Sequence, residues 1–210
     1  MELANRRVIV VGLGKSGVAA VRLCLAHGAV VIGTDAAPLE RLSPEARALA
    51  SEARCSLLAG GHDAVRFDEA DLVLVSPGVP PLAAVAAAEA RGVAVSSELD
   101  FAWDLYREVP TVAVGGTNGK STTTTLVAEI LAADGRRTFA GGNLGTPLAE
   151  VAPGPGEHAK DRWDALVLEV SSFQAERMPT FHPKAATLLN VTADHLDRYP
   201  SLEAYADAKG

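Results

Sequence analysis

A lysine and a serine stand side by side at the end of a glycine-rich turn near the middle of the chain. The apolar run Thr111–Val114 precedes this turn, and Thr124–Leu131 after it carries apolar residues at helical spacing. Because the order is strand, glycine turn and helix, several backbone N–H groups would point into one concavity, which suits a polyphosphate. Lys120 would reach the β- and γ-phosphates, and the Ser121 hydroxyl would ligate Mg²⁺.

This turn departs from the common phosphate-loop pattern G-x-x-x-x-G-K-[ST] at its first position. Val114 stands where that pattern has a glycine, and we expect Gly115 and Gly116 to supply the bend instead. The alternative is a glycine turn before a threonine-rich helix, with Lys120 merely solvated. The Gly-Lys-Ser sequence at a strand-to-helix junction favours the phosphate loop.

A second glycine turn lies near the N-terminus. Arg7–Val11 is mostly β-branched, the turn Gly12–Gly17 has the form G-x-G-x-x-G, and Val18–Ala26 follows with a helical apolar pattern. Asp35 ends the next strand-like run, where a ribose-binding carboxylate belongs in a dinucleotide site. The same turn serves other phosphorylated ligands at a helix N-terminus, so the pattern alone leaves the ligand open.

A stiff loop, Ser76–Pro81, ends another strand-like run, Ala70–Val75. In open α/β sheets, ligands bind beyond the carboxyl ends of the strands, so this loop and Gly12–Gly17 could face one crevice. A rigid Pro/Gly connector is the alternative.

Two further groups stand where a metal could bind. Glu169 is the one charge in the apolar run Ala165–Val170, and a carboxylate at the end of a buried strand is a natural Mg²⁺ ligand. The alternative is an edge position with the carboxylate reaching water. His195 lies close to Asp194, Asp197 and Arg198, and a neutral imidazole could hold a second metal. A capping or hydrogen-bonding histidine is the alternative there.

These groups must be positioned by alternating strands and helices, which indicate an α/β fold with a parallel sheet covered on both faces. Arg107–Pro110 interrupts the alternation, so we place a domain boundary there, between residues 1–108 and 109–210. Ser201–Lys209 is predicted to be a helix capped by Ser201. The chain stops directly after it, and we expect the second domain to be truncated. The strand-like runs are Arg7–Val11, Ala29–Gly33, Cys55–Leu58, Ala70–Val75, Val93–Ser96, Thr111–Val114, Thr138–Ala140, Ala165–Val170 and Ala185–Leu189.

The composition excludes several classes of protein. The 210 residues are 48% hydrophobic with a net charge of −7, which describes a globular chain and disfavours nucleic-acid binding. No apolar run approaches membrane-spanning length and no signal core follows the first basic pair, so we expect a cytoplasmic protein. Cys24 and Cys55 lack metal-type spacing, and we expect reduced core residues in preference to a disulfide.

Three runs together resemble the Mur ligases, namely Gly116–Thr123 (GTNGKSTT), Leu168–Gln174 (LEVSSFQ) and Asn190–Pro200 (NVTADHLDRYP). The resemblance extends over the whole chain in order. It is closest to the members that join D-glutamate to UDP-N-acetylmuramoyl-L-alanine. It implies a Rossmann-like parallel-sheet domain that holds the UDP substrate instead of a nicotinamide cofactor, followed by part of a P-loop ATPase α/β domain.

The reaction implied by the resemblance belongs to peptidoglycan precursor synthesis. ATP would phosphorylate the carboxylate of the L-alanyl end, and the amine of D-glutamate would attack the acyl phosphate to form an amide. ATP and Mg²⁺ are the implied cofactors. We expect a monomer whose partners are these small molecules, with no nucleic acid and no membrane.

The resemblance also implies roles for single residues. The ATP-binding residues are Gly116, Thr117, Asn118, Gly119, Lys120, Ser121 and Thr122. The metal ligands are Ser121, Glu169, His195 and Lys209, the last as a lysine carbamylated by CO₂, and the catalytic residues are Lys120, His195 and Lys209. The substrate-binding residues are Lys15, Ser16, Asp35, Gly78, Asn143 and Ser171. Ala36 and Ala37 stand where the family has a Thr-Arg pair on the uracil side.

Other functions compete with a ligase. An NAD-dependent oxidoreductase would use Gly12–Gly17 and Asp35 but leave Glu169 and the His195 cluster without a role. A non-catalytic nucleotide-binding module or GTPase-like switch would need a guanine-reading Asn-Lys-x-Asp element, which the sequence lacks. A folylpolyglutamate synthetase would not need the first domain. Because a Mur ligase has further chain after the central domain, we expect this piece to bind the UDP substrate without completing ligation.

Overall fold

Five parallel strands form the first sheet of the computed structural model, which describes residues 2–143, 145–196 and 198–209. The strands are β1 (Arg7–Val11), β2 (Val30–Asp35), β3 (Cys55–Ala59), β4 (Leu72–Val75) and β5 (Ala94–Ser97), in the order β3-β2-β1-β4-β5. Along the central strand β1, Val8 and Val10 face one hydrophobic core, and Ile9 and Val11 face another. Both faces of the sheet are therefore covered, as predicted.

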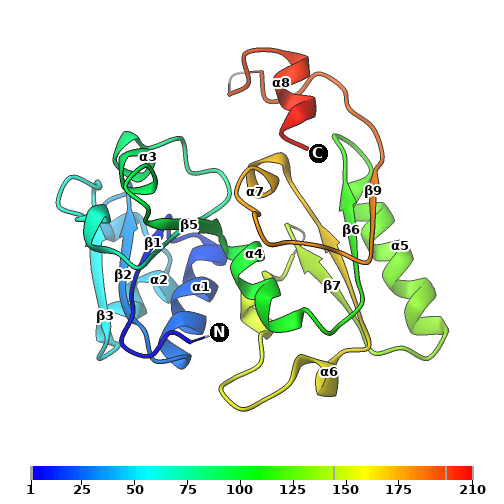
Figure 1. Cartoon of the computed structure of the whole chain (residues 1–210), viewed down its shortest axis with the longest axis horizontal. Coiled ribbons are helices and arrows are strands. Elements are labelled where there is room, and N and C mark those ends of the chain that lie inside the picture. The colour runs from blue at the N-terminus through cyan, green and yellow to red at the C-terminus, as the bar shows by residue number, and fades with distance from the viewer. Residues whose placement is uncertain (1, 144, 197, 210) are drawn as a thin grey trace.

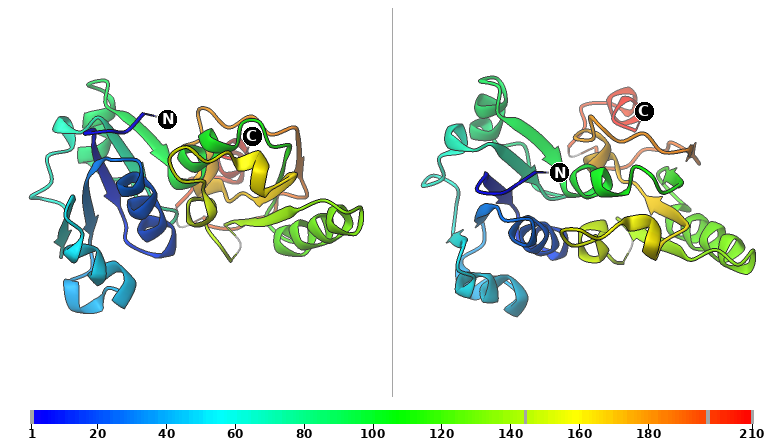
Figure 2. Two further views of the ribbon diagram at one scale, coloured as in Figure 1. Left: turned by 90° about the horizontal axis from the view of Figure 1, so that it is seen from below. Right: turned by 60° about the horizontal axis from the view of Figure 1, so that its bottom comes forward.

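Helices pack on the two faces of this sheet (Figures 1 and 2). The helices α1 (Lys15–Ala26), α2 (Pro44–Ala48) and α4 (Glu98–Trp103) contribute to the core that contains Val8 and Val10. The helix α3 (Ala83–Glu89) contributes to the other core. Helix α2 is capped by Ser43, because the Ser43 hydroxyl accepts a hydrogen bond from the N–H of Ala46 at 3.1 Å.

Four parallel strands form the second sheet. They are β6 (Thr111–Gly115), β7 (Thr138–Gly142), β8 (Ala165–Glu169) and β9 (Ala185–Leu188), in the order β7-β8-β6-β9. The helices of this half are α5 (Lys120–Ala133), α6 (Ala159–Arg162), α7 (Ser172–Ala175) and α8 (Leu202–Asp207). All five residues of β8 are buried between β7 and β6, whereas β9 lies at the edge and is exposed.

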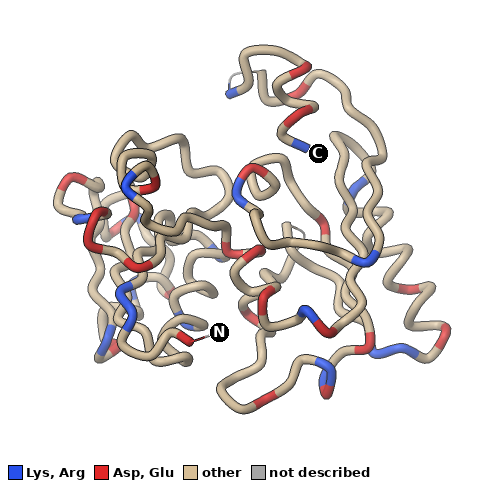
Figure 3. Tube along the Cα trace, viewed as in Figure 1, with Lys and Arg blue, Asp and Glu red and all other residues tan. Residues whose placement is uncertain are grey.

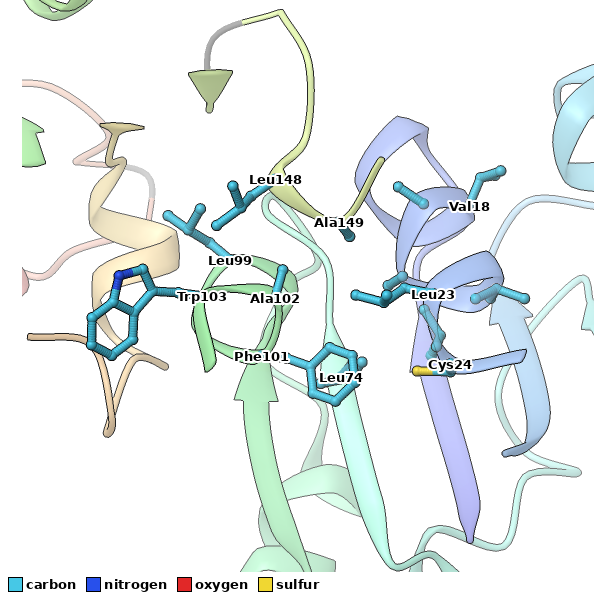
Figure 4. Close-up of a cluster of buried hydrophobic side chains, with 14 of the residues drawn as sticks. Val18, Leu23, Cys24, Leu74, Leu99, Phe101, Ala102, Trp103, Leu148 and Ala149 are labelled. Atoms are coloured by element: carbon cyan, nitrogen blue, oxygen red, sulfur yellow. The ribbon is translucent and has the colours of Figure 1, made fainter. Parts of the chain in front are cut away.

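The two sheets meet at α4. Figure 4 shows Leu148 and Ala149, from a 3₁₀ turn of the second half, beside Leu99 and near α1. The Ala149 N–H donates to Glu98 Oε1 at 2.7 Å. One hydrophobic core runs from β1 and α1 through α4 to Leu166 and Leu168 of β8. The domain boundary between residues 108 and 109 therefore stays a prediction.

The second glycine-rich junction begins its helix earlier than the apolar pattern indicates. Helix α5 starts at Lys120 and not at Thr124, because its first turn is polar and carries no apolar signal. Val114 and Gly115 both stay in β6. The bend comes at Gly116, with φ of 141°, so of the two glycines expected to supply it only Gly116 has left the strand.

The remaining expectations concern the surface and the cysteines. Basic and acidic residues are interspersed along the described trace, without a long block of one sign (Figure 3). Cys24 is buried and Cys55 half-buried, and both are free, as predicted. Burial raises the pKa of the Cys24 thiol to about 12, which makes it unreactive. None of the described helices is both long and apolar enough to cross a membrane.

Candidate functional site

A crevice of about 500 Å³ lies beyond the carboxyl ends of β1, β2 and β4. Five of the six residues predicted to bind the substrate line it, namely Lys15, Ser16, Asp35, Gly78 and Asn143. The loop after β4 also lines it, so the interpretation that this loop and the first glycine turn face one crevice is confirmed. Chain segments from both halves of the molecule contribute, because Asn143 follows β7.

Asp35 holds the first glycine turn in place. Its Oδ2 accepts the N–H of Leu13 at 2.7 Å, and its Oδ1 accepts the N–H of Ala37 at 2.8 Å. A carboxylate has further lone pairs, so Asp35 can still accept a hydrogen bond from a ligand hydroxyl. The structure therefore gives this residue a role in shaping the turn that the sequence pattern did not reveal.

His62 is a crevice residue that the sequence analysis missed. Its Nδ1 lies 2.9 Å from the Thr34 hydroxyl, and it lines the same crevice as Gly78 and Asn143. The only sequence signal for His62 was its place after the two glycines that follow β3, which is too weak to assign a site.

Lys15, another crevice residue, contacts the second half of the chain, since its Nζ donates to the carbonyl of Gly145 at 2.7 Å.

The phosphate loop connects β6 to α5. Gly119 is in the left-handed conformation, with φ of 83°, and caps the helix that Lys120 begins. The Lys120 ammonium donates to the carbonyl of Thr117 at 2.8 Å, so it lies over the loop and is not merely solvated. The positive end of a 14-residue helix and the N–H groups of its first turn complete an anion site.

Side chains that follow β9 hold this loop. Asn190 Oδ1 accepts the N–H of Asn118 at 2.9 Å, and Asn190 Nδ2 donates to the carbonyl of Asn118 at 3.0 Å. The N–H of Thr192 donates to the Thr117 hydroxyl at 3.1 Å. Within Asn190–Pro200 the sequence pointed to His195 and its charged neighbours, whereas the first residues of this run hold the phosphate loop.

Glu169 and Ser121, two of the predicted metal ligands, lie together. Ser121 Oγ donates to Glu169 Oε2 at 2.7 Å, and Asn143 Nδ2 donates to Glu169 Oε1 at 2.6 Å. Glu169 is 3% exposed on the interior strand β8, so the alternative of a solvated edge position is wrong. A buried carboxylate beside a serine hydroxyl supplies the oxygen donors that Mg²⁺ prefers, and this pair therefore fits the ion.

His195 and Lys209 contact residues other than Ser121 and Glu169. The His195 ring lies 4.9 Å from that of Phe173, and its φ of 52° is unusual for a residue with a side chain. Lys209 Nζ donates to the carbonyl of Gly116 at 3.0 Å and lies 4.4 Å from the centre of the Tyr205 ring. Among the described residues, no three His, Cys, Asp or Glu side chains gather as a metal site. Asp197 lies outside the described residues.

Ser171 does not line the crevice with the other predicted substrate residues. It caps α7, where its hydroxyl accepts the N–H of Gln174 at 3.3 Å and its own N–H donates to Gln174 Oε1 at 3.0 Å. It lines a separate cavity of about 500 Å³, to which Lys209 also contributes. Its part in substrate binding stays a prediction.

Two family models match the chain. A model of the N-terminal domain of MurD-like Mur ligases covers residues 6–97, and a model of the Mur ligase middle domain covers residues 114–210. The chain belongs to the Mur ligase family. The two matches leave out residues 98–113, which include α4 and the proposed boundary.

Two curated relatives of this Mur ligase chain carry the same name. UDP-N-acetylmuramoylalanine–D-glutamate ligase of Anaeromyxobacter dehalogenans is 51% identical over 99% of this chain and 44% of its own length. That of Myxococcus xanthus is 45% identical over 100% of this chain and 45% of its own length. The chain therefore spans less than half the length of these relatives.

A solved structure supports the fold alone. The UDP-N-acetylmuramate:L-alanyl-γ-D-glutamyl-meso-diaminopimelate ligase of Neisseria meningitides matches with a TM-score of 0.56 at 20% identity, over 98% of this chain and 66% of that one. The Mur ligase fold, with a Rossmann-like sheet followed by a P-loop sheet, thus agrees with the sequence prediction. Family membership favours the ligase over the oxidoreductase and the nucleotide switch.

Proposed function

We propose that this chain carries the UDP-substrate and ATP-binding parts of a UDP-N-acetylmuramoylalanine–D-glutamate ligase. One observation carries the proposal: Asn143 lines the crevice and also donates to Glu169, which accepts from Ser121 at the start of α5. The end of the crevice and the phosphate loop therefore meet at a shared side chain. A ligase that phosphorylates the carboxylate end of a nucleotide-activated substrate needs this arrangement, because the two reactants must touch there.

Different residues would bind ATP, the UDP substrate and Mg²⁺. Lys120 and the N–H groups at the start of α5 would neutralise the phosphates of ATP, while the first glycine turn and its helix α1 would hold the pyrophosphate of the UDP substrate. Ser121 and Glu169 would hold Mg²⁺, which offsets the negative charge of the phosphoryl oxygens. The acyl phosphate would form where Asn143 meets Glu169, and the amine of D-glutamate would attack it there.

His195 and Lys209 are proposed as further metal ligands. The Lys209 amine already reaches the carbonyl of Gly116, so a carbamate formed on it would lie beside the phosphate loop. Carbamylation requires the neutral amine, and the cation over the Tyr205 ring must therefore lose its proton first. D-glutamate binding and completed ligation are proposed for the whole protein, which we also expect to be a cytoplasmic monomer.

Calorimetry tests this proposal with the chain as it stands. We expect saturable binding of UDP-N-acetylmuramoyl-L-alanine and no binding of NADH in the same buffer. Binding of NADH alone would contradict the proposal, and the first glycine turn would then hold a dinucleotide.

Lys120→Ala separates the two ligands. Loss of a charge-assisted contact of about 1.5–3 kcal/mol should lower the affinity for Mg²⁺ and the ATP analogue AMP-PNP by roughly 10- to 100-fold, with UDP-substrate affinity within about twofold. Lys160→Ala, at an exposed ion pair with Glu108, is the matched control and should change neither affinity. A loss of both affinities in Lys120→Ala would show that the assignment of two sites is mistaken.

A further inference from the structure

Arg198 makes three contacts that reach both halves of the chain. Its Nη1 donates to the carbonyl of Val79 at 3.1 Å, and its Nη2 pairs with Glu176 Oε2 at 3.0 Å. Its guanidinium carbon lies 4.3 Å from the centre of the Phe173 ring. The Arg198 side chain is 18% exposed, whereas the Lys or Arg side chain of every other ion pair in the described residues is at least 46% exposed. Arg198 is therefore held in one geometry.

Val79, the backbone partner of Arg198, lines the crevice. Val79 lies in the loop Ser76–Pro80, and its Cγ2 is 2.6 Å from the point where a Cβ on Gly12 would stand. The Ser76 hydroxyl donates to the carbonyl of Gly12 at 2.7 Å. The loop is thus packed on the first glycine turn from one side and tied to Arg198 from the other.

The contact of Arg198 with the Phe173 ring connects it to the phosphate loop. The Phe173 ring lies 4.9 Å from that of His195, which lies 6.1 Å from that of Tyr205. The Tyr205 hydroxyl accepts a hydrogen bond from the Thr117 hydroxyl at 3.3 Å. The N–H of Arg198 itself donates to the carbonyl of His195 at 2.9 Å. A chain of contacting side chains therefore connects the phosphate loop to Arg198, so a shift of the loop can be transmitted to it.

We propose that Arg198 is a positioning residue that ties the crevice loop Ser76–Pro80 to the His195 turn, so that the affinity of the crevice for its ligand depends on occupancy of the phosphate loop. The planar guanidinium suits this task, because it can donate in two directions and stack on a ring at once. The identity of the two ligands rests on the proposed function, whereas the tie itself rests on the three contacts alone.

Hydrogen exchange of the chain without ligand tests the tie. Arg198→Met keeps the apolar stem and removes both donors. The amide of Val79, which donates to the carbonyl of Ser76 at 3.3 Å, should then exchange about tenfold faster, although the substitution lies in the other half. The amides of β1 and β2 should not change. Unchanged exchange in the crevice loop would overturn the proposal whatever the ligands are.

Calorimetry tests the dependence between the sites. In the unmodified chain, saturating AMP-PNP with Mg²⁺ should raise the affinity for UDP-N-acetylmuramoyl-L-alanine at least about fivefold. The ratio of the two affinities, with and without nucleotide, should fall close to one in Arg198→Met. Arg198→Lys keeps the charge without the planar guanidinium and should retain part of the increase. The proposed dependence would be overturned if Arg198→Met kept the affinity ratio of the unmodified chain, or if the unmodified chain itself had a ratio close to one.

Arg107→Met is the matched control. Arg107 also pairs with a carboxylate, Asp104, and also lies over a ring, that of Trp103, but it contacts neither site. It should leave both the exchange pattern and the affinity ratio unchanged. If the UDP substrate fails to bind at all while the exchange result holds, the proposed function fails and the tie stands.

Discussion

The two glycine turns of this chain have the same local architecture but are held by different parts of the molecule. Each follows a parallel strand and opens a helix. The first is fixed from within its own sheet, because Asp35 at the end of β2 accepts the N–H of Leu13 and Ser76 after β4 donates to the carbonyl of Gly12. The second is fixed by the side chain of Asn190, which follows the exposed edge strand β9.

This difference separates what glycines determine from what their neighbours determine. In both turns the glycines allow the backbone to bend at the strand end. The chemistry proposed for each turn comes from side chains around it: Lys120, Ser121 and the distant Glu169 give the second turn the groups that the proposed phosphate and metal sites need. At the first turn the carboxylate of Asp35 braces the backbone through the N–H groups of Leu13 and Ala37.

The sharpest test of the first turn is Gly17→Ala. A Cβ at Gly17 would stand 1.8 Å from the carbonyl oxygen of Gly12, so α1 would have to move away from the turn. We expect a loss of about 3 kcal/mol in the free energy of unfolding, measured by urea denaturation. Gly14→Ala is the control, because a Cβ there meets nothing within 4 Å and should cost little. Equal losses would show that the turn is not set by this close approach.

Glu98→Gln tests the hydrogen bond that joins the two halves, between Glu98 and Ala149, two residues outside both glycine turns. Burial raises the pKa of Glu98 from 4.5 to about 7, and its Oε2 has no hydrogen-bond partner among the described residues. Between these two pH values the folded chain holds a proton that the unfolded chain has lost. The free energy of unfolding should therefore fall by roughly 2 kcal/mol as the pH rises from about 4.5 to 7, and stay level above that.

Urea denaturation at several pH values measures this effect. Glu98→Gln cannot titrate, so its stability should lack this fall while other groups contribute as before. Affinities for the two ligands should not change, because each turn keeps its own supports. The interpretation of Glu98 would be wrong if the variant and the unmodified chain lost stability equally between pH 5 and 7.

The sequence predicted well what depends on neighbouring residues. Strand runs, the Ser201 cap and the glycine turns all follow from local spacing, and the structure confirms them. The crevice was also predictable, because parallel strands bring their carboxyl ends to one edge. His62 and the brace role of Asp35 were not, since they depend on contacts between segments that no periodicity reports.

Contacts between distant segments also limited what could be predicted about the second site. Glu169 was found because a charge in a buried strand is conspicuous, but its partners Ser121 and Asn143 come from two other segments. Arg198 was noticed only as one of several charges near His195. Its contact with Val79 spans 119 residues of sequence and both halves of the fold, so only the three-dimensional structure reveals it.

Asn190→Ala tests how the second turn is held, and we expect the smallest effect from it. The variant loses two hydrogen bonds to the backbone of Asn118, but this loop is exposed, so water can replace them in part. The loop should become less ordered before it binds, which we expect to lower the affinity for AMP-PNP and Mg²⁺ about fivefold, or roughly 1 kcal/mol. The affinity for UDP-N-acetylmuramoyl-L-alanine, measured by calorimetry on the same sample, should stay within twofold, because the first turn has its own supports. If Asn190→Ala weakened the UDP substrate as much as the nucleotide, the two turns would share one support, and the contrast between them would not hold.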